Sequence, residues 1–105
     1  MILEIARITL KPGLDEEFLA VAAEHGAEIF ASAVGCAGMQ LRKSLEAPDT
    51  YIMLVRWHTL DNHLIDFRGS DGFIRWRALT GELYAKPTEI ENFEIAFPGR
   101  GVDID

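Results

Sequence analysis

Four stretches of the chain are rich in apolar and β-branched residues, and in the second and fourth these alternate with polar side chains, which is the pattern of β-strands. Pro12 and Gly13 end the first stretch, and a turn at Pro48, Asp49 and Thr50 joins the second stretch to the third. We therefore expect four strands, the middle two forming a hairpin, over residues 2–10, 39–45, 51–57 and 88–95.

The segments between these strands carry apolar residues at helical spacing instead. Asp15 is a suitable N-cap for a helix of about five turns, and the small residues 34–38 end it. Thr59 and Ser70 can cap two shorter helices before the last strand. The side chains expected to face the core are, in chain order, Phe18, Ala22, Ile29, Ala33, Leu60, Leu64, Phe67, Phe73 and Trp76.

The resulting order of elements, βαββααβ, is the split βαβ arrangement of a ferredoxin-like domain whose second helix is broken in two. It predicts an α+β fold with an antiparallel sheet. A chain of 105 residues has room for one hydrophobic core. We expect a single domain over residues 1–97, followed by a flexible C-terminal tail over residues 98–105.

The third strand is apolar on both of its faces. Ile52 and Leu54 point to one side of the sheet, and Met53, Val55 and Trp57 point to the other. In a ferredoxin-like domain the helices cover only one side, so the second side needs another cover. The simplest cover is the same face of a second copy, which predicts a homodimer with sheet packed on sheet.

Charge and composition exclude several kinds of partner. Ten basic against 17 acidic side chains give a net charge of -7, which repels nucleic acid and anionic membrane surfaces. No segment approaches the ~20 apolar residues that span a bilayer, and the first residues have no secretory pattern, so we expect a cytoplasmic protein. Cys36 is the single cysteine and is expected to be a buried bystander.

Three polar side chains fall among the core-facing positions of the predicted helices: His25, His63 and Arg77. If all three helices pack on one sheet face, these groups converge in a mostly apolar pocket, the usual form of a small-molecule site. Each also has an ordinary structural explanation, since buried histidine is commonly bonded to backbone and arginine can reach a nearby carboxylate. Trp57 and Trp76 belong to the core or line a slot for an aromatic ring.

The sequence lacks the motifs of metal sites, phosphate-binding loops and serine hydrolases. His58 and His63 are five apart, off the spacing that puts two metal ligands on one helical face, so we expect no metal site. Gly35 and Gly38 follow a helix instead of opening one, which is not the arrangement of a phosphate-binding loop, and no G-x-S-x-G motif occurs. Nucleotide cofactors and serine hydrolase chemistry are therefore not indicated.

With this order of elements, several phrases resemble the antibiotic biosynthesis monooxygenase family. They are Pro12-Gly13 with Phe18, the run Gly35-Cys36-Ala37-Gly38, and Val55-Arg56-Trp57-His58-Thr59 leading to Phe67-Arg68-Gly69-Ser70. The resemblance covers roughly residues 2–97. It implies a dimeric α/β barrel in which each subunit has a pocket between its sheet and its helices.

Within that family the resemblance points away from heme degradation. The heme-degrading branch carries an asparagine, a tryptophan and an iron-binding histidine where this chain has Ala6, Phe67 and Arg77. The aromatic polyketide oxygenases are more similar, because Trp57 and Arg77 match their tryptophan and arginine. His63 stands where they carry a tyrosine, and Met53 where they carry an asparagine.

The resemblance implies a reaction without a cofactor, in which a phenol or quinol loses a proton and its anion reduces O₂. His63 would be the base and Arg77 would stabilise the developing anion, as catalytic residues. Substrate contacts would come from Trp57, Met53, His25, Trp76 and Phe67. Two function classes remain: an enzyme that oxidises a small aromatic molecule with O₂, and a dimer that binds an apolar small molecule without catalysis.

Overall fold

The computed structural model describes residues 1–100 and contains one antiparallel sheet of four strands, in the order β2-β3-β1-β4. The strands are β1 (Ile2–Thr9), β2 (Cys36–Lys43), β3 (Thr50–Trp57) and β4 (Glu89–Phe93). This topology confirms the prediction of a ferredoxin-like α+β fold. The expected C-terminal tail falls partly on residues 101–105, which lie outside the described residues.

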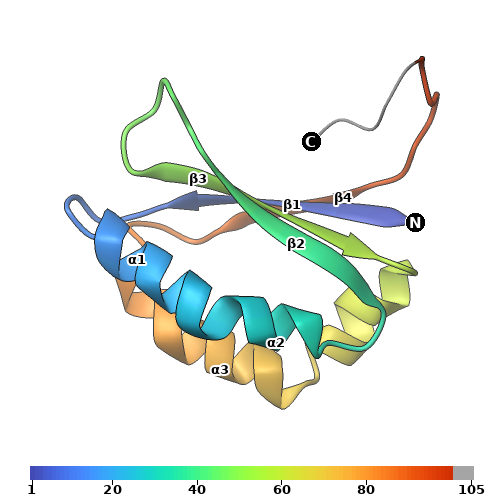
Figure 1. The fold of residues 1–105 in the computed structure, drawn as a ribbon, viewed down its shortest axis with the longest axis horizontal. Coiled ribbons are helices and arrows are strands. Elements are labelled where there is room, and N and C mark those ends of the chain that lie inside the picture. Colours follow the sequence, from blue (N-terminus) through green and yellow to red (C-terminus); the bar gives the residue numbers. More distant parts are fainter. Residues whose placement is uncertain (101–105) are drawn as a thin grey trace.

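All helices lie on one side of the sheet (Figure 1). The first consists of α1 (Asp15–Val21), a π-helical turn η1 (Ala22–Gly26) and α2 (Ala27–Ala31). After β3 come a second π-helical segment, η2 (Asn62–Phe67), then α3 (Asp71–Thr80) and a short 3-10 turn, η3 (Gly81–Leu83). No helix in residues 1–100 is long and apolar enough to cross a membrane.

Strand alternation decides which side chains reach the helices. On β1, Glu4, Ala6 and Ile8 are buried. On β3 the residues Tyr51, Met53, Val55 and Trp57 are buried, whereas Ile52 and Leu54 on the other side are half-buried. The two-sided apolar pattern predicted for the third strand is therefore confirmed.

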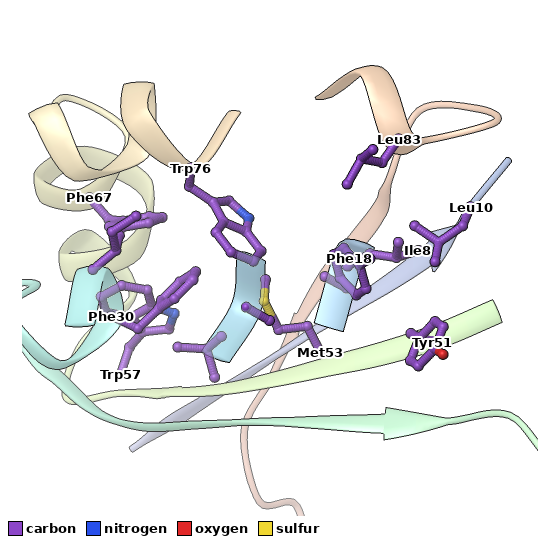
Figure 2. Packing of buried hydrophobic residues seen from close by; sticks show 14 residues of the cluster. Ile8, Leu10, Phe18, Phe30, Tyr51, Met53, Trp57, Phe67, Trp76 and Leu83 are labelled. Atoms are coloured by element: carbon purple, nitrogen blue, oxygen red, sulfur yellow. The ribbon is translucent and has the colours of Figure 1, made fainter. Parts of the chain in front are cut away.

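Aromatic rings fill the space between sheet and helices (Figure 2). Phe30 packs against Phe67 at a ring distance of 5.0 Å and against Trp76 at 5.5 Å. Phe67 also lies 5.2 Å from Trp57 on the sheet. These tilted and edge-on contacts pack α2, η2 and α3 against β3 and hold the helices on the sheet.

Helix ends follow their sequence signals in two of three cases. The Ser70 hydroxyl accepts a hydrogen bond from the backbone N–H of Phe73, as predicted for the start of α3. Thr59 and Asn62 cap each other, since each side chain accepts a hydrogen bond from the other's backbone N–H. Asp15 was wrongly predicted as an N-cap: it is the first residue of α1, and its Oδ2 accepts from the Tyr51 hydroxyl at 2.6 Å.

Three other predictions need correction. The second strand begins at Cys36 and ends at Lys43, so Leu45 lies outside it and is fully exposed. The fourth strand is shorter than expected. Leu60 is 41% exposed, whereas His63 and Phe67, which were predicted on the same inward face, are buried. A π-helical segment has more residues per turn than an α-helix, which changes the side chains that face inward.

Candidate active site

A cavity of about 600 Å³ lies between the inner face of the sheet and α3. Most of its wall is apolar and aromatic, and the segment between η3 and β4 closes one side. Its lining residues are Glu4, Ala6, Ile8, Phe30, Met53, His63, Phe67, Arg68, Phe73, Trp76, Arg77, Thr80, Gly81, Tyr84, Lys86, Pro87, Thr88 and Ile90. The volume is within the usual range for a small-molecule site.

One end of the cavity holds a buried hydrogen-bonded group centred on Glu4. Its Oε1 accepts a hydrogen bond from the indole N–H of Trp57 at 2.9 Å and lies 3.2 Å from Nε2 of His63. Nδ1 of His63 lies 2.8 Å from Oδ1 of Asn92 on β4. The imidazole is stacked on the indole of Trp57 with an interplanar angle of 7°. Four elements, β1, β3, η2 and β4, thus hold one imidazole in a single orientation.

The environment changes the acidity of Glu4. Burial raises the pKa of its carboxyl above the ordinary value. The hydrogen bond from Trp57 and the positive charges of His63 and Arg68 act in the opposite direction, but burial is the larger effect. Glu4 is only 3% exposed, as is His63. A buried carboxylate beside a histidine is an arrangement that suits proton transfer.

Arg68, Arg77 and Lys86 also line the cavity, and Lys86 forms a salt bridge with Glu89. The guanidinium of Arg77 lies over the ring of Phe73, 5.6 Å from its centre, which is a cation–π contact within α3. Arg68 follows η2 and faces the Glu4 carboxylate. Neither arginine forms a salt bridge with a carboxylate of residues 1–100. Arg77 therefore has its charge available to a ligand.

Tyr84 adds an uncharged polar group, its phenol hydroxyl, to the cavity wall. It lines the cavity, and burial raises the pKa of its phenol. The hydroxyl therefore stays protonated at neutral pH and can donate a hydrogen bond, but it is a poor proton acceptor.

The structure brings together most of the residues singled out from the sequence. His63, Arg77, Met53, Phe67 and Trp76 all line the cavity. Trp57 is not among its lining residues; it lies behind His63 and holds both that ring and Glu4.

His25 is placed elsewhere. It lies in η1, its side chain is 36% exposed, and its Nδ1 is 2.8 Å from a guanidinium nitrogen of Arg75. It is not among the residues that line the cavity.

Glu4, Asn92 and Arg68 were not identified from the sequence. The signal for Glu4 was present, because alternation along β1 puts it on the same side as Ala6 and Ile8. The pairing of β1 with β4 then places Asn92 directly opposite Glu4.

Within residues 1–100, no group of three or more His, Cys, Asp or Glu side chains is arranged to hold a metal ion.

Comparisons with known proteins give a consistent family assignment. A model of the antibiotic biosynthesis monooxygenase family matches residues 1–79. The chain is 34% identical over 94 residues to the protein YczJ of Bacillus subtilis (strain 168), covering 90% of this chain and 98% of YczJ.

Solved structures agree. A Bordetella bronchiseptica protein named after the same family is 41% identical, with a TM-score of 0.87 over 91% of this chain and 97% of that one. SnoaB, a cofactor-independent oxygenase from Streptomyces nogalater, has a TM-score of 0.75 at 20% identity, over 91% of this chain and 93% of SnoaB. At that identity the likeness to SnoaB concerns the fold alone.

Proposed function

We propose that this chain, which belongs to the antibiotic biosynthesis monooxygenase family, is a cofactor-independent monooxygenase that oxidises a small phenol or quinol with O₂. The observation that carries the proposal is the pairing of Glu4 with His63 inside a largely apolar cavity. Buried charges cost stability unless they are paired, so sites that keep them are frequently functional. The fold shared with SnoaB is compatible with the same type of reaction.

The chemistry needs two things from the protein. A phenol must first lose its proton, and the resulting anion must then meet O₂ where water is excluded. The anion gives one electron to O₂, and the two radicals join at the ring carbon opposite the oxygen. The peroxide gains a proton and loses water. One phenol with hydrogen on that carbon and one O₂ thus yield one quinone and one water. A quinol, whose carbon there already carries oxygen, instead passes two electrons and two protons to O₂ and yields quinone and hydrogen peroxide.

The side chains of the cavity divide these tasks. The buried pair of Glu4 and His63 receives the proton of the substrate hydroxyl. Arg77 supplies a positive charge to the phenolate and to the peroxide that follows it. Phe67, Trp76 and Met53 form apolar walls against which an aromatic ring can pack.

Oxygen uptake tests the proposal. Purified protein should consume O₂ with at least one member of a panel of hydroquinones and naphthols, with nothing else added. His63→Ala should lower turnover by about 10² to 10⁴, the range for a lost acid–base group. Arg77→Ala should lower it by about 10² to 10³.

The chain offers matched controls for both variants. His25→Ala and Arg75→Ala change the same residue types outside the cavity and should retain wild-type turnover. Equal losses in His25→Ala and His63→Ala would contradict the proposed site. No uptake with any member of the panel would contradict the proposed reaction.

Met53 favours a second candidate, a non-catalytic binder of apolar molecules. The oxygenases that the sequence resembles carry an asparagine amide at this position, and Met53 has a thioether there. The cavity wall therefore offers a substrate one hydrogen bond fewer. A binder would take up aromatic probes with the same affinity before and after His63→Ala and would consume no O₂. Titration of probe fluorescence, together with the uptake assay, separates the two candidates.

A homodimer is also part of the proposal. The sheet face opposite the helices carries an apolar strip of Leu3, Ile5, Ile52, Leu54 and Phe93, of which Phe93 is 42% exposed. A second copy placed on this strip would remove it from water.

Light scattering tests the dimer. At micromolar concentration the wild type should have twice the mass of one chain. Leu54→Glu should give monomers, whereas Leu45→Glu, at a fully exposed position outside the sheet, should leave the mass unchanged.

A further inference from the structure

The two ring nitrogens of His63 both face oxygen atoms of the protein. Nε2 lies 3.2 Å from Oε1 of Glu4, and Nδ1 lies 2.8 Å from Oδ1 of Asn92. A base needs a free lone pair directed at the proton it removes. Because both nitrogens are engaged, the imidazole has no free position for a substrate. Two acceptor oxygens instead match an imidazolium, which donates from both nitrogens.

Glu4 has the free position that His63 lacks. Its contacts with Trp57 and His63 both involve the oxygen Oε1. Among the described residues, no fully buried side-chain oxygen is without a hydrogen-bond partner. Oε2, which takes part in neither contact, is therefore the oxygen that meets the cavity lined by Glu4. A carboxylate oxygen without a donor is available to accept a proton.

On the assumption that the proposed oxidation of phenols is correct, we propose that Glu4 takes the proton from the bound phenol at Oε2. His63 is then a positioning residue that holds the carboxylate as an imidazolium. The O–H bond of the phenol breaks and an O–H bond forms on Oε2, with no electron transferred in this step. The phenolate is left in a cavity whose wall includes His63, Arg68 and Arg77.

The charges around Glu4 are suited to this role. His63 and Arg68 face it from η2 and the residue that follows, and the Cys36 thiol approaches it from β2. Burial raises the pKa of Glu4 more than the charges of His63 and Arg68 lower it, which makes the carboxylate a stronger base than an exposed glutamate. Burial, with a smaller contribution from the charge of Glu4, raises the pKa of the Cys36 thiol, so Cys36 stays protonated and does not compete as a base.

Binding of para-nitrophenol tests the proton acceptor without any turnover. Its phenolate absorbs visible light and its phenol does not, and a protonated carboxyl has its own infrared band. At a pH below the pKa of the free probe, wild-type protein should bind it as phenolate, and a carboxyl band should appear at the same time. In Glu4→Gln the carboxyl band should be absent, and the bound phenolate absorbance should fall by about tenfold, which corresponds to one pKa unit.

Two more variants separate the roles. Glu17→Gln makes the same change at an exposed position of α1, outside the cavity and the proposed dimer face, and should behave as the wild type. His63→Gln keeps an N–H that can reach Glu4 but loses the positive charge that lowers the pKa of Glu4, so the carboxyl band should already be present before the probe is added and the bound phenolate should fall. A purely structural role of His63 would not make the band independent of the probe.

The inference is overturned if phenolate forms in wild-type protein without the carboxyl band, if Glu4→Gln gives the wild-type signal, or if the probe does not bind. Results that refute the role of Glu4 differ from results that refute the proposed oxidation of phenols. Proton transfer to Glu4 without O₂ uptake from any phenol would refute the oxidation alone. O₂ uptake that needs His63 but is unchanged in Glu4→Gln would refute the role of Glu4 alone.

Discussion

Replacing Gly26 by alanine should destabilise the protein, although alanine normally strengthens a helix. Gly26 lies at the end of the π-helical turn η1, with ordinary helical dihedral angles. A Cβ atom there would lie 2.6 Å from Cζ3 and 3.2 Å from Cη2 of the Trp76 indole. Contacts between carbon atoms are normally about 3.5–4.0 Å, so the indole would have to move by roughly 1 Å.

The size of the effect follows from two opposing terms. Overpacking of a filled core costs about 1–3 kcal/mol, and replacing glycine in a helix returns about 0.5–1 kcal/mol. Gly26→Ala should therefore lower the free energy of unfolding by about 0.5–2 kcal/mol. Gly81→Ala is the matched control, because Gly81 is also helical and a Cβ there would meet nothing within 4 Å. It should raise the free energy of unfolding by about 0.4–1 kcal/mol.

Urea unfolding followed by tryptophan fluorescence measures both variants. The midpoint should fall for Gly26→Ala and rise slightly for Gly81→Ala. Trp76 also lines the cavity, so Gly26→Ala should weaken binding of para-nitrophenol as well. A midpoint for Gly26→Ala equal to or above that of Gly81→Ala would show that Trp76 moves aside freely, and the packing described for this core would then be wrong.

Three other variants test the buried polar contacts. Glu4→Gln should make the protein more stable at neutral pH. Burial raises the pKa of Glu4, so the stability that the protonated carboxyl contributes is fully present below the ordinary value of 4.5. That stability is lost in the wild type as the pH rises through the pKa of Glu4 in the folded protein. Urea midpoints from acidic to neutral pH should fall for the wild type relative to Glu4→Gln. Trp57→Phe removes a hydrogen bond to a carboxylate and should cost at least about 1.5–3 kcal/mol in the same assay. It should also raise the pKa of Glu4 further, because the indole N–H lowers it. Burial and the hydrogen bond to Asp15 raise the pKa of Tyr51 from 10.0 to about 12, so the wild type should lose stability as the pH rises from 10 to 12. Tyr51→Phe should be less stable than the wild type below pH 10 and should show no such loss. Alkaline unfolding curves check this, and parallel curves for the two proteins would contradict it.

The fold could be predicted because each local signal agreed with the global arrangement. Alternation on β3 and the cap at Ser70 required no knowledge of tertiary contacts. Predictions failed where tertiary contacts decide the local structure. Asp15 does not cap α1 because its carboxylate bonds to Tyr51 on the sheet. Leu60 was wrongly placed inside: it lies at the start of its helix, before η2, and is 41% exposed.

The site was only partly predictable for a related reason. Helical spacing put His63 and Arg77 at inward positions, and both line the cavity. The interactions of His63 depend instead on strand register, which pairs Glu4 with Asn92 across β1 and β4. A single sequence does not specify that register, so neither partner of the imidazole could be assigned beforehand.

The π-helical turn η1 has a consequence for how the chain tolerates changes in length. Its backbone bond from the N–H of Ala27 to the carbonyl of Ala22 spans one residue more than an α-helical turn. Deleting one residue from the turn could restore an α-helix and keep Phe18 and Phe30 each on the sheet side. The same deletion within α2, before Phe30, would rotate the residues that follow by about 100° and turn Phe30 away from Phe67 and Trp76. Alignments of relatives should therefore place single-residue gaps in this helix at η1.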